Sequence, residues 1–212
     1  MTGGLTTDWA LDWVRRSAAV VAEHRAELGA LDREIGDGDH GENLDRGFRA
    51  VLAKLEGAEP ANPGAVLKLV ATTLMSTVGG ASGPLLGTAY LKAAGAVGDA
   101  DELDPAAVVA LLTAARDGIV LRGKAEAGDK TMVDAWTPAV DAAGAAAQSG
   151  ADPAVVLAAA AAAGEQGALA TEPLVARKGR ASYLGERAIG HRDPGAESSA
   201  LQLRAAADAA AG

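Results

Sequence analysis

The chain has 212 residues and a formal net charge of −9; it is 49% hydrophobic but only 3% aromatic, and it has no cysteine. The lack of cysteine excludes disulfides and thiolate chemistry, and the acidic balance argues against nucleic acid or an anionic membrane surface as the main partner. The length and the lack of an obvious linker predict a single domain over residues 1–212.

Neither a membrane segment nor a signal peptide is predicted. The longest alanine-rich run, residues 154–163, falls short of the about 20 apolar residues that span a bilayer. Near the start of the chain, Asp8 and Asp12 interrupt the first apolar positions, and no basic region precedes them. We therefore expect a cytoplasmic protein that does not associate with membranes.

The first predicted helix covers Thr6 to about Ala30, where apolar residues recur with helical spacing. It leads into an acidic, glycine-rich stretch, residues 31–43. Glycine at this density is unfavourable inside a helix or strand. The stretch is therefore expected to form a tight loop that carries Asp32, Asp37 and Asp39.

Three carboxylates on one loop repel one another unless a cation neutralises them. Oxygen ligands without cysteine suit Mg²⁺ better than zinc. An EF-hand is disfavoured, because counting from Asp32 or Asp37 does not give that loop's spacing. Considered alone, the stretch is also compatible with an Asp-Gly turn between two helices.

Helical spacing of apolar residues resumes at Leu44 and continues to Leu55, which predicts a helix that starts near residues 41–43. The free N–H groups at the start of a helix favour anions. Carboxylates that bind a cation, next to N–H groups that bind an anion, indicate a metal-bridged phosphate.

Six further helices are predicted downstream, and no strand. The pairs Asp104-Pro105 and Asp152-Pro153 each combine an N-cap with a first-turn proline, and Ser82 is expected to cap another helix. The six helices cover about residues 63–79, 83–97, 105–122, 130–148, 153–170 and 197–211. The segment 172–196 has no periodicity. The sequence therefore predicts an all-α fold with eight main helices.

Four blocks resemble the nucleotide-binding L subunit of bacterial dihydroxyacetone kinases, and they occur in the order of that family. They are Gly36-Asp37-Gly38-Asp39-His40-Gly41-Glu42-Asn43, Gly79-Gly80-Ala81-Ser82-Gly83-Pro84, and the blocks within residues 122–134 and 179–196. The resemblance implies a closed antiparallel eight-helix barrel with the nucleotide at one end.

The resemblance also implies a set of site residues. Asp32, Asp37 and Asp39 would hold Mg²⁺, as two ions, and Arg180 would act in catalysis with them. The residues expected around ADP or ATP are His40, Gly41, Glu42, Asn43, Ala81, Ser82, Gly123, Met132, Arg180, Asp193, Pro194 and Gly195.

Several of these residues have plainer interpretations when they are considered one at a time. The turn at residues 79–84 would be an ordinary connection between helices, and Gly123 an ordinary C-cap. Met132 at helical spacing would be a core residue, and Arg180 a solvated surface charge. The resemblance is what favours the functional interpretation of each.

The resemblance further implies a phosphotransferase subunit that needs a partner. The L subunit binds the nucleotide, whereas a separate K subunit holds dihydroxyacetone covalently. ADP can stay bound and be recharged by a phosphocarrier protein of the phosphotransferase system, or ATP can exchange as a substrate. The residues leave open both modes, another small ketose or a fatty acid as substrate, and a regulatory module that binds MgADP without turnover. We expect a homodimer.

Overall fold

The computed structural model describes residues 3–212, and the regular elements of this part of the chain are helices, apart from one isolated β-bridge between Leu5 and Leu103. The all-α prediction is confirmed. The elements are α1 (Thr7–Glu23), α2 (Arg25–Ile35), α3 (His40–Leu55), α4 (Pro63–Thr77), α5 (Ser82–Val97), α6 (Pro105–Gly123), α7 (Met132–Gln148), α8 (Pro153–Leu169), the 3₁₀ helix η1 (Arg180–Ala188) and α9 (Pro194–Ala211). Within residues 3–212, each helix is too short or too polar to cross a membrane.

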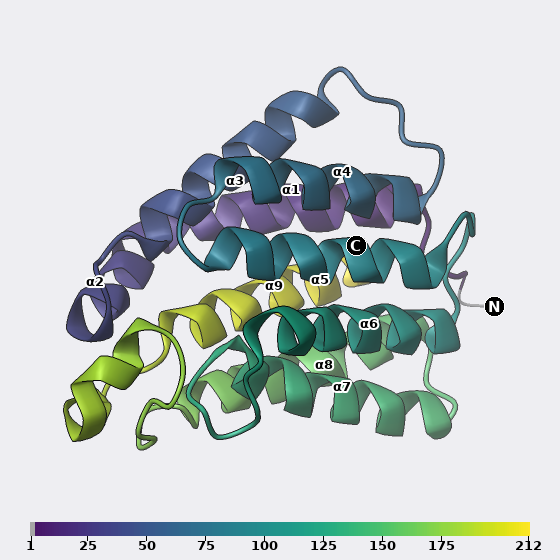
Figure 1. Cartoon of the computed structure of the whole chain (residues 1–212). Helices are drawn as coiled ribbons and strands as arrows, with labels where there is room; N and C mark the ends of the chain where they lie inside the picture. Colours follow the sequence, from purple (N-terminus) through teal and green to yellow (C-terminus); the bar gives the residue numbers. More distant parts are fainter. Residues whose placement is uncertain (1–2) are drawn as a thin grey trace.

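Eight of the helices close into a ring (Figure 1). From α3 to α9 each long helix packs against the next one in the chain, α9 packs against α1, and α1 packs against α3. Helix α2 follows α1 after a break at His24 and contacts α3, α9 and η1 at one end of the ring. The predicted eight-helix barrel is confirmed, and α2 and η1 extend it at that end.

Asparagine and aspartate caps, each followed by proline, set where four helices begin. The side chains of Asn62, Asp104, Asp152 and Asp193 each accept the N–H of the residue three positions later. The predicted starts of α6 and α8 are therefore correct. The predicted start of the last helix, residue 197, is three residues late. Helix α9 begins at Pro194, and Asp193-Pro194 carries the same cap and proline signal as the other pairs.

Two other helix boundaries were predicted wrongly. The first helix does not run from Thr6 to Ala30, since it breaks at His24 and resumes as α2, so Asp32 lies in the last turn of α2 and not on a loop. Ser82 does not cap α5: Ala81 is at the N-cap, and the Ser82 hydroxyl bonds to His40 instead. The segment 172–196 also includes η1.

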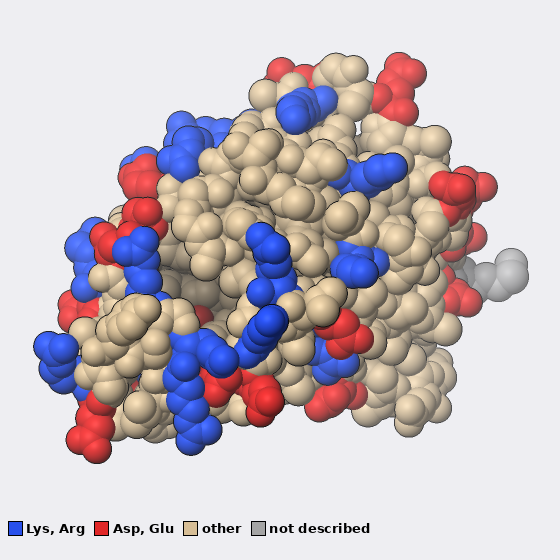
Figure 2. All heavy atoms as spheres, in the orientation of Figure 1, with Lys and Arg blue, Asp and Glu red and all other residues tan. Residues whose placement is uncertain are grey.

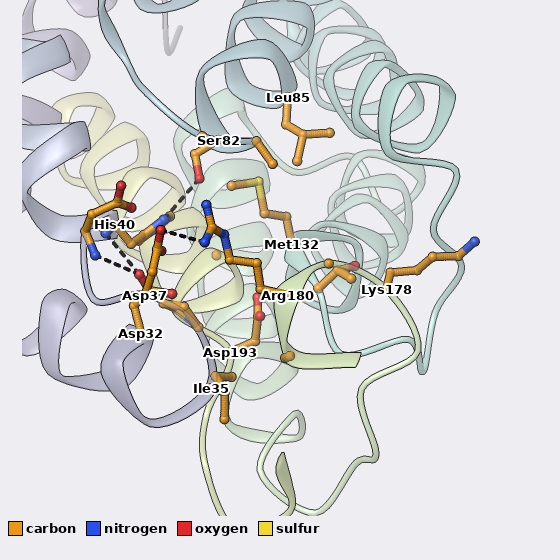
Figure 3. A pocket seen from close by; sticks show the side chains of 18 of the residues that line it. Asp32, Ile35, Asp37, His40, Ser82, Leu85, Met132, Lys178, Arg180 and Asp193 are labelled. Atoms are coloured by element: carbon orange, nitrogen blue, oxygen red, sulfur yellow. Dashed lines mark hydrogen bonds and ion pairs between the residues drawn. The ribbon is translucent and has the colours of Figure 1, made fainter. Parts of the chain in front are cut away.

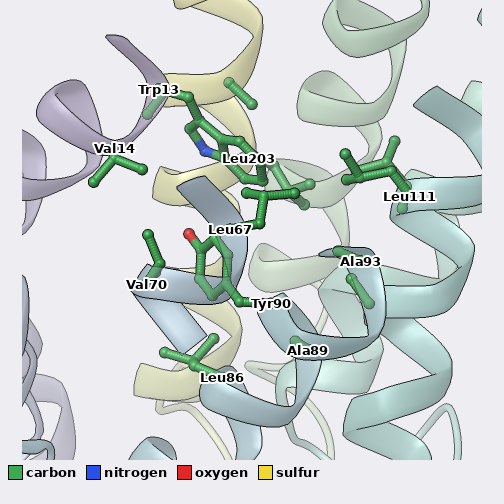
Figure 4. Close-up of a cluster of buried hydrophobic side chains, with 14 of the residues drawn as sticks. Trp13, Val14, Leu67, Val70, Leu86, Ala89, Tyr90, Ala93, Leu111 and Leu203 are labelled. Atoms are coloured by element: carbon green, nitrogen blue, oxygen red, sulfur yellow. The ribbon is translucent and has the colours of Figure 1, made fainter. Parts of the chain in front are cut away.

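Three aromatic side chains, Trp9, Trp13 and Tyr90, pack together in the core, and Figure 4 shows Trp13 and Tyr90 among the buried apolar residues around them. The rings of Trp9 and Trp13 on α1 stack with centroids 5.2 Å apart, and Trp13 lies 5.5 Å from Tyr90 on α5. Both indole N–H groups donate to carbonyls of α9, at Ala206 and Gln202, over 3.0 and 2.9 Å. These contacts fasten α1 to α9 and pack it against α5, and they satisfy both buried indole N–H groups.

Glycine allows α7 and α8 to approach closely. A Cβ added to Gly167 in α8 would lie 2.2 Å from the carbonyl oxygen of Asp134, whereas a Cβ on Gly144 in α7 would meet no atom within 4 Å. We expect Gly167→Ala to lower the free energy of unfolding by about 2 kcal/mol through overpacking, and Gly144→Ala to raise it by up to about 1 kcal/mol. Urea denaturation of both variants tests this, and equal effects would contradict the close contact.

Candidate functional site

A pocket opens at the end of the barrel where α2 and η1 lie (Figure 3). Its walls come from the end of α2, the starts of α3, α5, α7 and α9, and the segment that leads into η1. The residues predicted for the site that line it are Asp32, Asp37, Asp39, His40, Asn43, Ala81, Ser82, Met132, Arg180, Asp193, Pro194 and Gly195. The fold thus brings together residues from all four sequence blocks.

The three aspartates form a compact carboxylate cluster. One oxygen from each of Asp32, Asp37 and Asp39 lies within 4.8 Å of the others, with Asp32 buried and the other two exposed. Carboxylate oxygens at this spacing, with no sulfur donor in the sequence, form a donor set suited to a hard divalent cation.

Asp32 links the cluster to the start of α3. Its Oδ2 accepts the backbone N–H of Asp39 at 2.9 Å and that of His40 at 3.2 Å. The Asp39 side chain, at the N-cap of α3, makes no capping bond, and Asp32 satisfies the N–H groups of the N-cap residue and of the first residue of the helix. The other oxygen, Oδ1, would lie 2.1 Å from a Cβ on Gly36, so a side chain at this position would force the carboxylate to move.

Asp37 is engaged by Arg180. The guanidinium Nη1 of Arg180 lies 2.8 Å from Asp37 Oδ2, and the two side chains are 65% and 35% exposed. An ion pair this exposed is worth about 1 kcal/mol or less. A cation bound to Asp37 can therefore displace Arg180 at little cost.

His40 is buried and bonded through both ring nitrogens. Nδ1 lies 3.0 Å from the Ser82 hydroxyl, and Nε2 lies 2.9 Å from the Ser198 hydroxyl. Burial lowers the pKa of His40 to about 4, although the Asp39 charge and the Pro194 carbonyl act to raise it. The imidazole is therefore neutral at physiological pH.

Asn43 faces the pocket from the first turn of α3. Its Oδ1 accepts Nη2 of Arg46 at 2.7 Å, and Nε of Arg46 donates to the carbonyl of Thr77 at 3.2 Å. A Cβ on Gly79 would come within 3.1–3.3 Å of the Asn43 amide, so the 79–81 turn lies directly over it. Because the amide oxygen is occupied, Asn43 can offer its NH₂ group to a ligand.

A second, mainly apolar pocket adjoins the first. It is lined by Ala81, Pro84, Leu85, Ile119, Arg122, Gly123, Ala125, Thr131, Met132, Val133, Lys178 and Gly179. Met132, Leu85 and Ala81 line both pockets. Gly123, predicted for the site, lies here and not beside the carboxylates. The two pockets together offer an acidic end and an apolar end to one ligand.

Two predicted site residues do not line either pocket. Gly41 is buried against α2, where a Cβ would meet the Arg25 carbonyl at 2.1 Å, so its role in the structure is the close approach of α2 and α3. The Glu42 side chain is 62% exposed and pairs with Arg25 at 3.4 Å, on the outer face of α3. The structure gives neither residue a place on the pocket walls.

Lys130 lines the pocket but was missing from the predicted set. This buried side chain donates to the carbonyls of Thr171 at 2.6 Å and Glu172 at 3.2 Å. Burial lowers its pKa, while the carboxylates of Asp193 and Glu172 act to raise it. Lys130 thereby fastens the segment that leads to Arg180. Its place in the block at residues 128–134 was the only signal in the sequence.

Replacing Lys130 with methionine should loosen this segment. The substitution removes both Nζ hydrogen bonds, while each carbonyl keeps one backbone N–H donor, from Leu174 and Gly190. We therefore expect the free energy of unfolding to fall by about 1–2 kcal/mol and amide exchange to rise in residues 171–193. Exchange mass spectrometry and urea denaturation measure the two effects. Lys68→Met, on the exposed face of α4, is the control and should change neither the exchange nor the free energy of unfolding. Unchanged exchange in residues 171–193 of Lys130→Met would contradict the role of Lys130 in fastening this segment.

Basic side chains surround the hollow on this face, although the chain as a whole is acidic (Figure 2). Arg180, Lys178 and Arg122 line the two pockets. Positive charge at the rim attracts a polyanion, while the carboxylate cluster needs a cation. A metal-bound phosphate ester satisfies both.

Known proteins resemble the chain over nearly all of its length. The DAK2 domain matches residues 34–208. The "PEP-dependent dihydroxyacetone kinase, ADP-binding subunit DhaL" of Escherichia coli is 43% identical, covering 94% of this chain and 95% of that protein. The corresponding PTS-dependent subunit of Lactococcus lactis is 41% identical, covering 92% and 94%.

A solved structure supports the same relationship. The dihydroxyacetone kinase from C. freundii in complex with AMP-PNP and Mg²⁺ matches with a TM-score of 0.70 at 25% identity, covering 98% of this chain. The chain spans 35% of the length of that solved chain. The chain therefore belongs to the DAK2 domain family and, within it, to the family of dihydroxyacetone kinase L subunits.

Proposed function

We propose that this chain is the nucleotide-binding subunit of a dihydroxyacetone kinase. ADP or ATP would lie across the two joined pockets, with its base in the apolar one and its phosphates beside the carboxylate cluster. The terminal phosphoryl group would pass to dihydroxyacetone held on a separate K subunit. The observation that carries the proposal is the cluster of Asp32, Asp37 and Asp39, which opens directly beside the apolar pocket.

Asp32, Asp37 and Asp39 would hold Mg²⁺, in our proposal two ions. The donor set fits, because three carboxylates converge and the free Oδ1 of Asp32 is not used in capping α3. When bound, Mg²⁺ supplies positive charge that neutralises and orients phosphate oxygens. The protein's part is to hold the three carboxylates in place.

Other residues would bind and orient the nucleotide. Asn43 and the first residues of α5 line the pocket, so the Asn43 NH₂ group and the free N–H groups at the start of α5 are donors available for phosphate oxygens. Met132 and Leu85 provide apolar contact for the base. Arg180, once released from Asp37, can meet negative charge that develops on the transferred group. Catalysis here would depend on positioning and charge.

The relatives favour ADP as a resident cofactor. Two of them are named ADP-binding subunits of PEP-dependent or PTS-dependent kinases, so we propose that a phosphocarrier of the phosphotransferase system recharges ADP on this chain. The K subunit and this phosphocarrier would then be its partners. The expected homodimer stays a prediction, which sedimentation velocity would test.

The content of the purified protein tests the proposal. We would wash the protein extensively, denature it, and quantify the nucleotide and Mg²⁺ released. Close to one ADP and about two Mg²⁺ per chain support the resident mode. An empty protein that rebinds and exchanges MgATP supports the ATP-dependent mode. A protein that binds neither nucleotide contradicts the proposal.

A further inference from the structure

The contacts of Ser198 fix the position of the proton on His40. The Ser198 hydroxyl is fully buried; it lies 3.1 Å from the Gly195 carbonyl oxygen and 2.9 Å from His40 Nε2. A carbonyl can only accept a hydrogen bond, and a hydroxyl has a single proton. Ser198 therefore donates to Gly195 and accepts from an N–H at Nε2.

The opposite nitrogen must then be an acceptor. His40 is buried and both of its ring nitrogens contact uncharged hydroxyls, which favours the neutral ring. A neutral imidazole with its proton on Nε2 has a lone pair at Nδ1. The Ser82 hydroxyl, 3.0 Å away, donates its proton to that lone pair. The oxygen lone pairs of Ser82 remain for whatever occupies the pocket.

We propose that Ser198 is a positioning residue for nucleotide binding: it holds His40 as the Nε2–H tautomer, so that Ser82 presents an acceptor to the ligand. The inference rests on the proposed function, and it assigns the Ser82 side chain to Mg²⁺, to a metal-bound water or to a ribose hydroxyl. Phosphate oxygens would take donors instead, such as the backbone N–H groups at the start of α5. The hydrogen bonds from Ser198 through His40 to Ser82 connect α9, α3 and α5.

The tautomer can be measured without nucleotide. The chain has only three histidines, so long-range proton–nitrogen NMR spectra of the complete protein can be assigned by comparison with His40→Gln. We expect a pyridine-type shift at Nδ1 of His40 and a pyrrole-type shift at Nε2. The reverse pattern in the wild-type protein overturns the proposal, whether or not MgADP binds.

Ser198→Ala and Ser199→Ala form a matched pair. Both hydroxyls are buried and both donate to the Gly195 carbonyl, but only Ser198 contacts His40. We expect Ser198→Ala to shift His40 toward a mixture of tautomers and to weaken MgADP binding about tenfold. Ser199→Ala should leave the His40 shifts unchanged and the affinity within about twofold.

The outcomes separate positioning from stability. If both variants lose thermal stability and affinity equally, with His40 unchanged, Ser198 is only a packing residue and the proposal is wrong. If the wild-type protein shows the expected tautomer but no affinity for MgADP, the proposed function fails while the hydrogen-bond polarity stands. Calorimetry with MgADP and thermal unfolding of both variants provide the comparison.

Discussion

Replacing Asp37 with asparagine is expected to lower the affinity for MgADP roughly a thousandfold, since it removes one of three charged oxygen ligands. The change is nearly isosteric. In the described structure the Asp37 side chain is 35% exposed, and its ion-pair partner is Arg180. The fold should therefore be retained. Calorimetry with MgADP, together with circular dichroism, measures affinity and helix content.

Asp37 is a cleaner test than Asp32. The Asp32 carboxylate also accepts two N–H groups at the start of α3, so its replacement would disturb the helix start as well as the proposed metal site. A loss of affinity in Asp32→Asn would thus have two explanations. Asp37 allows the metal assignment to be tested without this ambiguity.

Glu34→Gln is the matched control for charge. Glu34 lies three residues before Asp37 with 62% of its side chain exposed, and it does not line the pocket. Glu34→Gln removes one negative charge, as Asp37→Asn does, but no proposed metal ligand, so the affinity for MgADP should stay within about twofold of wild type. An equal loss in both variants would indicate a general field effect, and an unchanged affinity in Asp37→Asn would exclude Asp37 as a metal ligand.

The sequence predicted the fold well because its helix signals are local. Asp104-Pro105 and Asp152-Pro153 set the starts of α6 and α8 within their own first turns. Asp193-Pro194 carries the same signal and would have given the start of α9. The break at His24 was missed, because apolar spacing continues across it and no proline or glycine marks it.

The site was predicted where its residues are close in sequence or belong to recognisable blocks. The spacing of Asp37 and Asp39 in a glycine-rich stretch already indicated a cation. Ser198 and Lys130 could not be found in this way, because their roles depend on partners 158 and 41 residues away in the chain. A serine in a helix or a lysine in a loop has no local pattern that reveals burial, so only the packed structure identifies them.

Arg180→Ala should reduce phosphoryl transfer to dihydroxyacetone, assayed with the K subunit, roughly a thousandfold, which is the scale of an arginine that stabilises a phosphoryl transition state. Nucleotide affinity should fall by less than about tenfold, because the carboxylates and the apolar pocket remain. Single-turnover transfer and calorimetry distinguish the two quantities. A loss confined to binding would make Arg180 a clamp on the ground state.

The ion pair with Asp37 gives the same variant a second effect of opposite sign. Arg180 and a metal ion compete for Asp37 Oδ2, so removing the guanidinium should raise the affinity for Mg²⁺ alone by up to about fivefold, the worth of an exposed ion pair. Arg187→Ala, a second exposed arginine of η1 that does not line the pocket, should change neither quantity. Tighter Mg²⁺ binding together with slower transfer is a combination that loss of folding cannot produce, and it would identify Arg180 as a residue that leaves the metal site in order to act on the phosphate.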